Sequence, residues 1–226
     1  MRTMLLILAL ALPAWSAPPV FWRPGLIETH SYTTAESGVP GTSTYTLRGI
    51  MREGKKVLEV EVVTKRTLVL GGQEGKLETY SLTWIEPETF DFLASRLRTT
   101  LNTAEASYLR SERVAGGKVE IRQKLRGSPE DSRTVDVGAP VVEENALLFF
   151  LTRAQLRPGV SERFMRFSAA QGRVTDAFIT LEKEGAEQRI RMVTDIAPSV
   201  FYLRSGNPPV IVRTEVGGTE QLKLVE

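Results

Sequence analysis

The chain has 226 residues, of which 42% are hydrophobic and 25% charged, with a formal net charge of +2 and no cysteine. This composition is typical of a globular protein, and a β-rich chain of this length often forms one domain. The balanced charge excludes a strongly basic nucleic-acid-binding protein, so we expect no nucleic acid as a partner. The lack of cysteine excludes disulfides, zinc–thiolate sites, iron–sulfur clusters and thiol catalysis.

The first 17 residues predict a cleavable signal peptide. Arg2 precedes an apolar run from Met4 to Leu12, and the small residues that follow suit cleavage after Ser16 or Ala17. The run is too short to cross a bilayer, which disfavours the alternative of a permanent anchor. We therefore expect a periplasmic or secreted protein that does not span a membrane after cleavage. Residues 18–226 are expected to form a single β-rich domain.

Alternating polar and apolar residues predict strands along most of the chain after residue 42. The apolar members of the clearest runs are Leu58, Val60 and Val62; Tyr80, Leu82 and Trp84; Val119, Ile121 and Leu125; Ile190 and Met192; and Leu222 and Leu224. Turn sequences separate such runs at hairpin spacing, at Glu53-Gly54, Gly71-Gly72, Gly116-Gly117, Gln171-Gly172, Glu184-Gly185, Gly206-Asn207-Pro208 and Gly217-Gly218. One-sided strands joined by hairpins indicate an antiparallel sheet with one wet face. We predict roughly ten strands.

A first short helix is predicted between residues 87 and 102. Phe90, Leu93, Ala94 and Leu97 fall at helical spacing, and Pro87 suits a first helical turn. A long antiparallel sheet tends to curl, and its concave face must be filled. We therefore expect a mainly β fold, a curved antiparallel sheet or incompletely closed β-barrel, with two short helices packed on its concave face.

The second helix is predicted in the segment EENALLFFLTRAQLRPG, residues 143–159. Its six consecutive apolar residues surround much of the helix, with glutamates at the start and Pro158-Gly159 at the end. A buried core helix, a membrane-active segment and a lid over a ligand cavity are the alternatives. Six apolar residues are too few to span a bilayer. The segment is therefore interpreted as the plug or lid of the curled sheet.

No catalytic motif accompanies the titratable residues. His30 is the single histidine, without a nucleophile motif or clustered carboxylates for a triad or metal site. The acidic pairs have the composition of turns or capping positions, and the glycine pairs lack the context of a phosphate-binding loop; the acidic pairs are Glu86 with Glu88, Glu130 with Asp131, and Glu143 with Glu144. We expect no enzyme, no metal and no cofactor, with a carboxylate-dependent hydrolase as the minority alternative.

The abundance of large apolar residues suggests a binding function instead. We predict a non-enzymatic envelope protein that binds a lipid or other apolar ligand, such as an acyl chain, in the concavity. The residues expected to line that cavity are Trp84, Leu147, Leu148, Phe150 and Leu151. The alternative is a structural or protein-interaction module with a fully packed core, whose partner would be another envelope protein.

Three segments carry a resemblance to a known family. ENALLFFLTRAQLRPG, SVFYLRSGNPPVIVRTEV and SLTWIEPETF resemble segments of exported bacterial proteins of the domain of unknown function 3108 family, over a region from about residue 45 to the end. That family has no established activity. The resemblance implies a curved, incompletely closed antiparallel barrel, similar in outline to the periplasmic lipoprotein carriers, which hold acyl chains beneath helices. A shared fold does not fix function.

Overall fold

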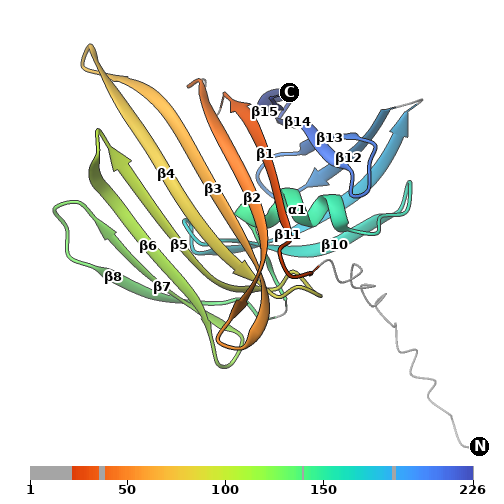
Figure 1. The fold of residues 1–226 in the computed structure, drawn as a ribbon, viewed down its shortest axis with the longest axis horizontal. Coiled ribbons are helices and arrows are strands. Elements are labelled where there is room, and N and C mark those ends of the chain that lie inside the picture. Colours follow the sequence, from red (N-terminus) through yellow and green to blue (C-terminus); the bar gives the residue numbers. More distant parts are fainter. Residues whose placement is uncertain (1–21, 36–38, 139, 185–186, 226) are drawn as a thin grey trace, which may run out of the picture.

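The computed structural model describes residues 22–35, 39–138, 140–184 and 187–225 (Figure 1). The expected signal peptide lies outside these residues. The described chain is mainly β, in one open sheet, which confirms the predicted class. The predicted element count was wrong, because the sheet has 15 strands and the described residues contain one α-helix and one short 3-10 helix.

Two meanders build this sheet, and a helical connection joins them. The first comprises β1 (Ile27–Thr34), β2 (Gly41–Arg52), β3 (Lys55–Leu70), β4 (Gln73–Ile85), β5 (Phe92–Leu101), β6 (Ala104–Val114), β7 (Lys118–Leu125) and β8 (Asp131–Asp136). The connection comprises β9 (Val142–Glu143), the 3-10 helix η2 (Glu144–Ala146) and α1 (Leu147–Arg153). The second meander comprises β10 (Ser161–Ser168), β11 (Arg173–Glu184), β12 (Glu187–Val193), β13 (Ser199–Arg204), β14 (Val210–Val216) and β15 (Thr219–Leu224).

The strand order places the beginning and the end of the chain side by side. It runs β8-β7-β6-β5-β4-β3-β2-β1-β15-β14-β13-β12-β11-β10-β9, so β1 and β15 pair in the middle. The named strands pair antiparallel except β9 with β10. The sheet curls around α1 and its two edge strands, β8 and β9, do not pair with each other (Figure 1). The product is an incompletely closed barrel with a helix inside it.

The predicted turns within the described residues fall between paired strands, whereas Gly185 of the predicted Glu184-Gly185 turn lies outside the described residues. Gly116 and Gly117, for example, connect β6 to β7 with φ values of 78° and 71°. Side chains other than glycine rarely adopt such angles, which is why a glycine pair predicts a tight hairpin. Alternation was also informative in β3, where Leu58, Val60 and Val62 are buried.

The predicted helix between residues 87 and 102 was wrong. Residues 92–101 form β5, and Phe90 lies in the preceding turn with a φ of 58°. The pairing of β4 with β5 shifts register between Trp84 and Ile85, so Leu93 interrupts the strand alternation. The extra residue places the apolar residues of this segment at helical spacing, although β5 pairs with both β4 and β6.

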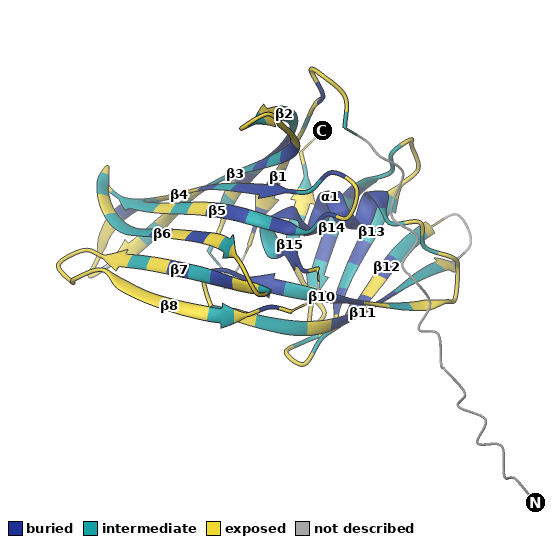
Figure 2. Ribbon diagram, turned by 90° about the horizontal axis from the view of Figure 1, so that it is seen from below, coloured by how far each residue is buried: buried dark blue, intermediate teal, exposed yellow. Residues whose placement is uncertain are grey.

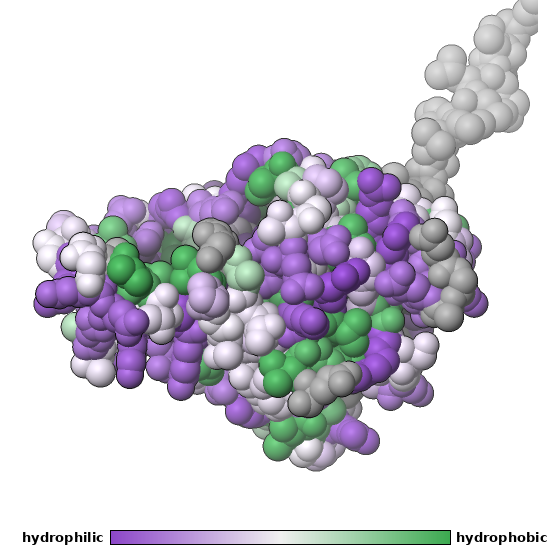
Figure 3. Space-filling model, turned by 90° about the horizontal axis from the view of Figure 1, so that it is seen from above, coloured by the Kyte–Doolittle hydropathy of each residue, from purple (hydrophilic) through white to green (hydrophobic). Residues whose placement is uncertain are grey.

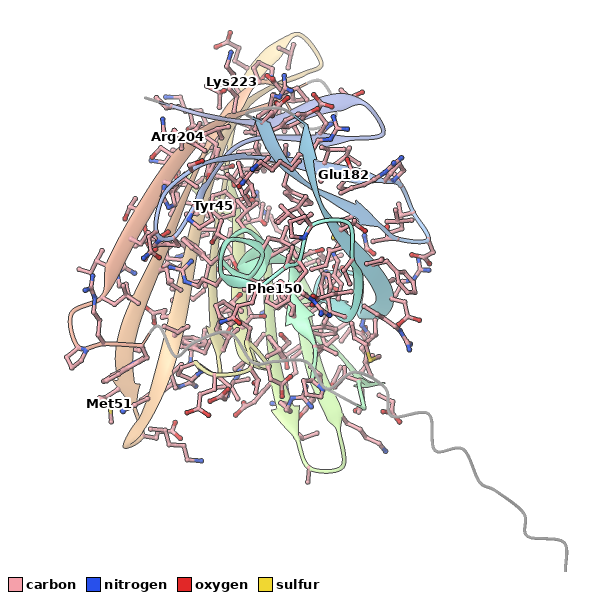
Figure 4. All side chains as sticks on the ribbon, turned by 90° about the vertical axis from the view of Figure 1, so that its right-hand side faces the viewer. Tyr45, Met51, Phe150, Glu182, Arg204 and Lys223 are labelled. Atoms are coloured by element: carbon pink, nitrogen blue, oxygen red, sulfur yellow. The ribbon has the colours of Figure 1, made fainter. Side chains whose placement is uncertain are left out.

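The second predicted helix is confirmed as α1, and it is buried on all sides. All seven of its residues are buried. Figure 2 shows α1 among the dark blue parts of the surrounding strands, and Figure 4 places Phe150 in the interior. The largest hydrophobic cluster joins α1 to β1–β4 and β10–β14. The helix therefore connects the two meanders through their common core.

Among the residues described, no helix combines the length and the apolar character needed to cross a bilayer.

Candidate functional site

The structure brings together four of the five residues expected to line a cavity. Leu147, Leu148, Phe150 and Leu151 all belong to the main hydrophobic cluster. The Phe150 ring lies 5.0 Å from that of Phe164, between centroids, and is fully buried. These side chains are packed against strand residues, as in an ordinary protein interior.

The space beside the helix is small. A cavity of about 10 Å³ lies next to Leu148, where α1 faces β1, β2 and β14. Its lining residues are Glu28, His30, Tyr32, Tyr45, Leu148, Phe149, Thr152 and Ile211. Such a volume accommodates about one water molecule, whereas pockets for small ligands measure roughly 300–1,000 Å³. An acyl chain does not fit in this cavity.

The fifth residue, Trp84, lies on the opposite face of the sheet. Its ring belongs to a separate hydrophobic cluster and is sandwiched by Arg52 and Arg96, whose Cζ atoms lie 4.2 Å and 5.5 Å from the ring centroid. Its indole nitrogen donates a hydrogen bond to Glu59 at 2.9 Å. The neighbouring inward residue of β4 is Thr83, which is fully buried. Trp84 therefore does not share a site with the helix residues.

A buried ion pair fixes the C-terminal end of α1 to β1. The Arg153 side chain is 2% exposed and contacts the Glu28 carboxylate, which also forms a 2.8 Å hydrogen bond with His30 Nε2. Arg153 also donates to the carbonyl oxygen of Phe149 at 3.2 Å. Burial alone would raise the pKa of Glu28, but His30 and Arg153 outweigh it and hold the pKa below its ordinary value. His30 of β1 thus belongs to a partly buried structural cluster.

A second buried carboxylate lies where β9 leads into η2. Glu143 Oε2 accepts hydrogen bonds from the Asn145 backbone at 2.7 Å and from Thr83 of β4 at 3.3 Å. Burial, together with the nearby charge of Glu144, raises the pKa of Glu143 well above its ordinary value. Glu144 points elsewhere and accepts from Arg166 of β10 at 3.0 Å. The pair thus ties the connection to both meanders.

The other acidic pairs also have local roles. The Glu86 carboxylate accepts from the backbone of Glu88 and Thr89 in the β4–β5 turn, at 2.9 Å and 2.6 Å. Glu130 lies in the β7–β8 connection, and Asp131 begins β8. Among the described residues, no group of three His, Asp or Glu side chains is placed to hold a metal ion. The absence of enzyme activity stays a prediction.

One surface depression lies on the outer face of the sheet. It measures about 290 Å³ and is lined by Glu78, Tyr80, Arg98 and Thr100, on neighbouring positions of β4 and β5. Its lining is polar and charged. An apolar ligand would gain little there.

The inner face of the sheet continues beyond the core, on a projecting part that we call the wing. The wing consists of residues 64–79, 97–107 and 121–133, and it extends away from α1 (Figures 1 and 2). Its strands change from buried near α1 to half-buried and exposed at the far end (Figure 2). Its inner face carries Leu68, Leu77 and Leu101, all half-buried, and Leu125, which is 50% exposed.

Register and packing place these leucines together. Leu77 pairs directly with Leu101, and Leu68 pairs with Gly75. A side chain on Gly75 would meet Leu101 Cδ1 at 3.3 Å, so the glycine leaves room for that leucine. Threonines alternate with the leucines along this inner face, for example Thr79. Hydrophobic residues are visible among hydrophilic ones at the wing's end of the molecule in Figure 3.

No family model, curated protein or solved structure matches the chain.

The resemblance to the domain of unknown function 3108 family therefore stays a prediction. Sequence reasoning placed the helix residues together but did not group the wing's leucines, because they come from four different strands. It also missed the Glu28–Arg153 pair. Arg153 is the last residue of α1 and the one charged residue in it, and a charge in that position was the available indication of a buried partner.

Proposed function

We propose that the protein is a non-enzymatic, exported binding protein that holds a lipid-like ligand on the inner face of the wing. The observation that carries this proposal is the group of partly exposed, inward-facing leucines on the part of the strands that extends beyond α1. Apolar side chains gain free energy when a ligand removes them from water, by about 25 cal/mol for each Å² buried. The alternating threonines favour an amphiphile over a purely apolar molecule, because hydroxyls can bind its polar groups.

A fluorescent fatty acid, measured with a variant of the wing face and a matched control, tests the proposal. Replacing both Leu77 and Leu101 with glutamine removes a directly paired apolar couple from the inner face. Replacing Val63 and Val69 with glutamine changes the same part of the sheet on its outer face, where Val69 is 70% exposed. We expect wild-type protein and the valine variant to bind the probe. The leucine variant should bind on the order of 10-fold more weakly.

Native mass spectrometry of protein purified from cells gives an independent measurement. A ligand-bound mass that the leucine variant lacks would support the proposal. A clean ligand-free mass together with no uptake of the probe by wild-type protein would contradict it. Equal losses in the leucine and valine variants would also contradict it, because the effect would then not belong to the inner face.

A second candidate function is a protein-interaction module, and the packing of α1 favours it. The helix is buried, and the adjacent cavity holds about one water molecule, so this cavity is too small for a lipid-like ligand. Leu147→Glu distinguishes a packed interior from a solvent-filled one. In a packed interior, the buried unpaired charge costs several kcal/mol and should abolish folding. A folded Leu147→Glu protein would contradict the packed interior.

A further inference from the structure

Four basic residues lie together where β2 turns into β3 and where the described chain begins. Arg52 and Lys55 are partners across this hairpin, and Lys56 follows in β3. Arg23 adjoins Trp22, whose ring centroid lies 4.9 Å from Lys56 Nζ. We call Arg23, Arg52, Lys55 and Lys56 the basic rim.

Most of the positive charge of the basic rim is not compensated by carboxylates within the described chain. Arg52 Nε lies 4.0 Å from Oε1 of Glu53, whose side chain is 86% exposed, and the other three rim residues form no ion pair within the described chain. Two of the cations are held by rings instead, Arg52 over Trp84 at 4.2 Å and Lys56 over Trp22 at 4.9 Å. An aromatic face positions a cation without cancelling its charge. Four cations and one carboxylate leave a local charge of +3.

Apolar surface accompanies this charge. Met51, which pairs with Lys56, is 58% exposed at the end of the hairpin (Figure 4). Basic residues interleaved with exposed apolar side chains are typical of surfaces that bind anionic bilayers. A nucleic acid would explain the charge but not the exposed methionine.

We propose that the basic rim binds the surface of an anionic lipid bilayer. Each lysine or arginine interacts with the negative headgroups, and Met51 enters the boundary between headgroups and acyl chains. The rim and the wing's end lie at opposite ends of β3, at Lys55 and Leu70. Binding through the rim therefore points the free end of the wing away from the bilayer. This surface does not depend on the ligand proposed for the wing.

Sedimentation of the full chain with lipid vesicles tests the proposal. The probes are vesicles of phosphatidylcholine alone and vesicles that also contain phosphatidylglycerol. One variant replaces Arg23, Lys55 and Lys56 with glutamine, all of them exposed. The matched control replaces three exposed cations on the outer face of β6 and β7 with glutamine. They are Arg110, Arg122 and Lys124. Both variants lose three charges.

We expect wild-type protein and the control to bind anionic vesicles more tightly than neutral ones. The rim variant should lose on the order of 100-fold in affinity for the anionic vesicles. Binding should also weaken as salt rises from about 0.05 M to about 0.5 M, because salt screens exposed charges. Circular dichroism of all three proteins confirms that the fold is retained.

Three outcomes would overturn the proposal. Wild-type protein that binds both vesicle types equally would show that the charge of the basic rim does not carry the interaction. Equal losses in the rim and control variants would show a general effect of net charge. If the wild-type protein bound neither vesicle type, the proposal that the rim binds a bilayer would be contradicted.

Discussion

Replacing Phe150 with alanine measures how tightly the interior of the barrel is packed. The side chain is fully buried and its ring centroid lies 5.0 Å from that of Phe164 and 5.7 Å from that of Phe90. Truncating a buried phenylalanine to alanine typically costs about 3–5 kcal/mol, which includes the cavity left behind. Domains are stable by only about 5–15 kcal/mol, so the variant should lose a large share of its stability.

Urea denaturation followed by circular dichroism is the assay. With an m-value of about 2.5 kcal/mol per M, a loss of about 4 kcal/mol lowers the midpoint by about 1.5 M. Phe178→Ala is the matched control, because Phe178 is 46% exposed on β11, and its midpoint should move by less than about 0.5 M. If Phe150→Ala costs no more than Phe178→Ala, the helix is not packed against the sheet. That result would contradict a tightly packed interior and would favour a ligand cavity around the helix.

Three further predictions concern buried polar groups. Arg153→Met leaves the Glu28 carboxylate without its cation and should cost about 3–5 kcal/mol, and adding Glu28→Gln should restore part of this loss in thermal unfolding. Because the folded-state pKa of Glu143 is raised, the folded protein holds a proton that the unfolded chain releases above its ordinary pKa of about 4.3. Stability should therefore fall as the pH rises from about 4.3 toward the folded-state pKa, by up to about 1.4 kcal/mol per unit, and Glu143→Gln should flatten this slope in urea titrations at several pH values. Ser81 Oγ is buried without a hydrogen-bond partner, so Ser81→Ala should leave the urea midpoint unchanged or raise it, and a clear decrease would indicate an ordered water at this site.

Strand pairing could be predicted from the sequence where alternation and turns agree. In β7, Val119 and Ile121 are buried as expected, but Leu125 is 50% exposed because the strand extends past the core into the wing. Strands without apolar alternation were missed and account for the low strand count. An example is β8, whose six residues are nearly all exposed.

The candidate site was harder to predict, because a sequence pattern does not identify which face of a strand is the inner one. The apolar residues of β4, including Leu82 and Trp84, suggested the core face, but the inner face there carries Ser81 and Thr83. The 3-10 helix η2 packs against β3 and β4, where small hydroxyl residues allow close approach. Trp84 is accommodated outside because arginines cover its ring. Only the three-dimensional arrangement supplies these neighbours.

The pairing of β1 with β15 has a consequence for how the protein reaches its folded state. Contacts such as the one between Thr33 and Lys223 join residues 190 positions apart, so the first strand must wait for the last one to be delivered. Contacts between distant positions slow folding, because the intervening chain has to be ordered first. During synthesis from the N-terminus, β1 therefore lacks one of its two neighbours until β15 has been made. Loss of β15 would separate β1 from β14 and open the sheet in its middle as well as at its edges.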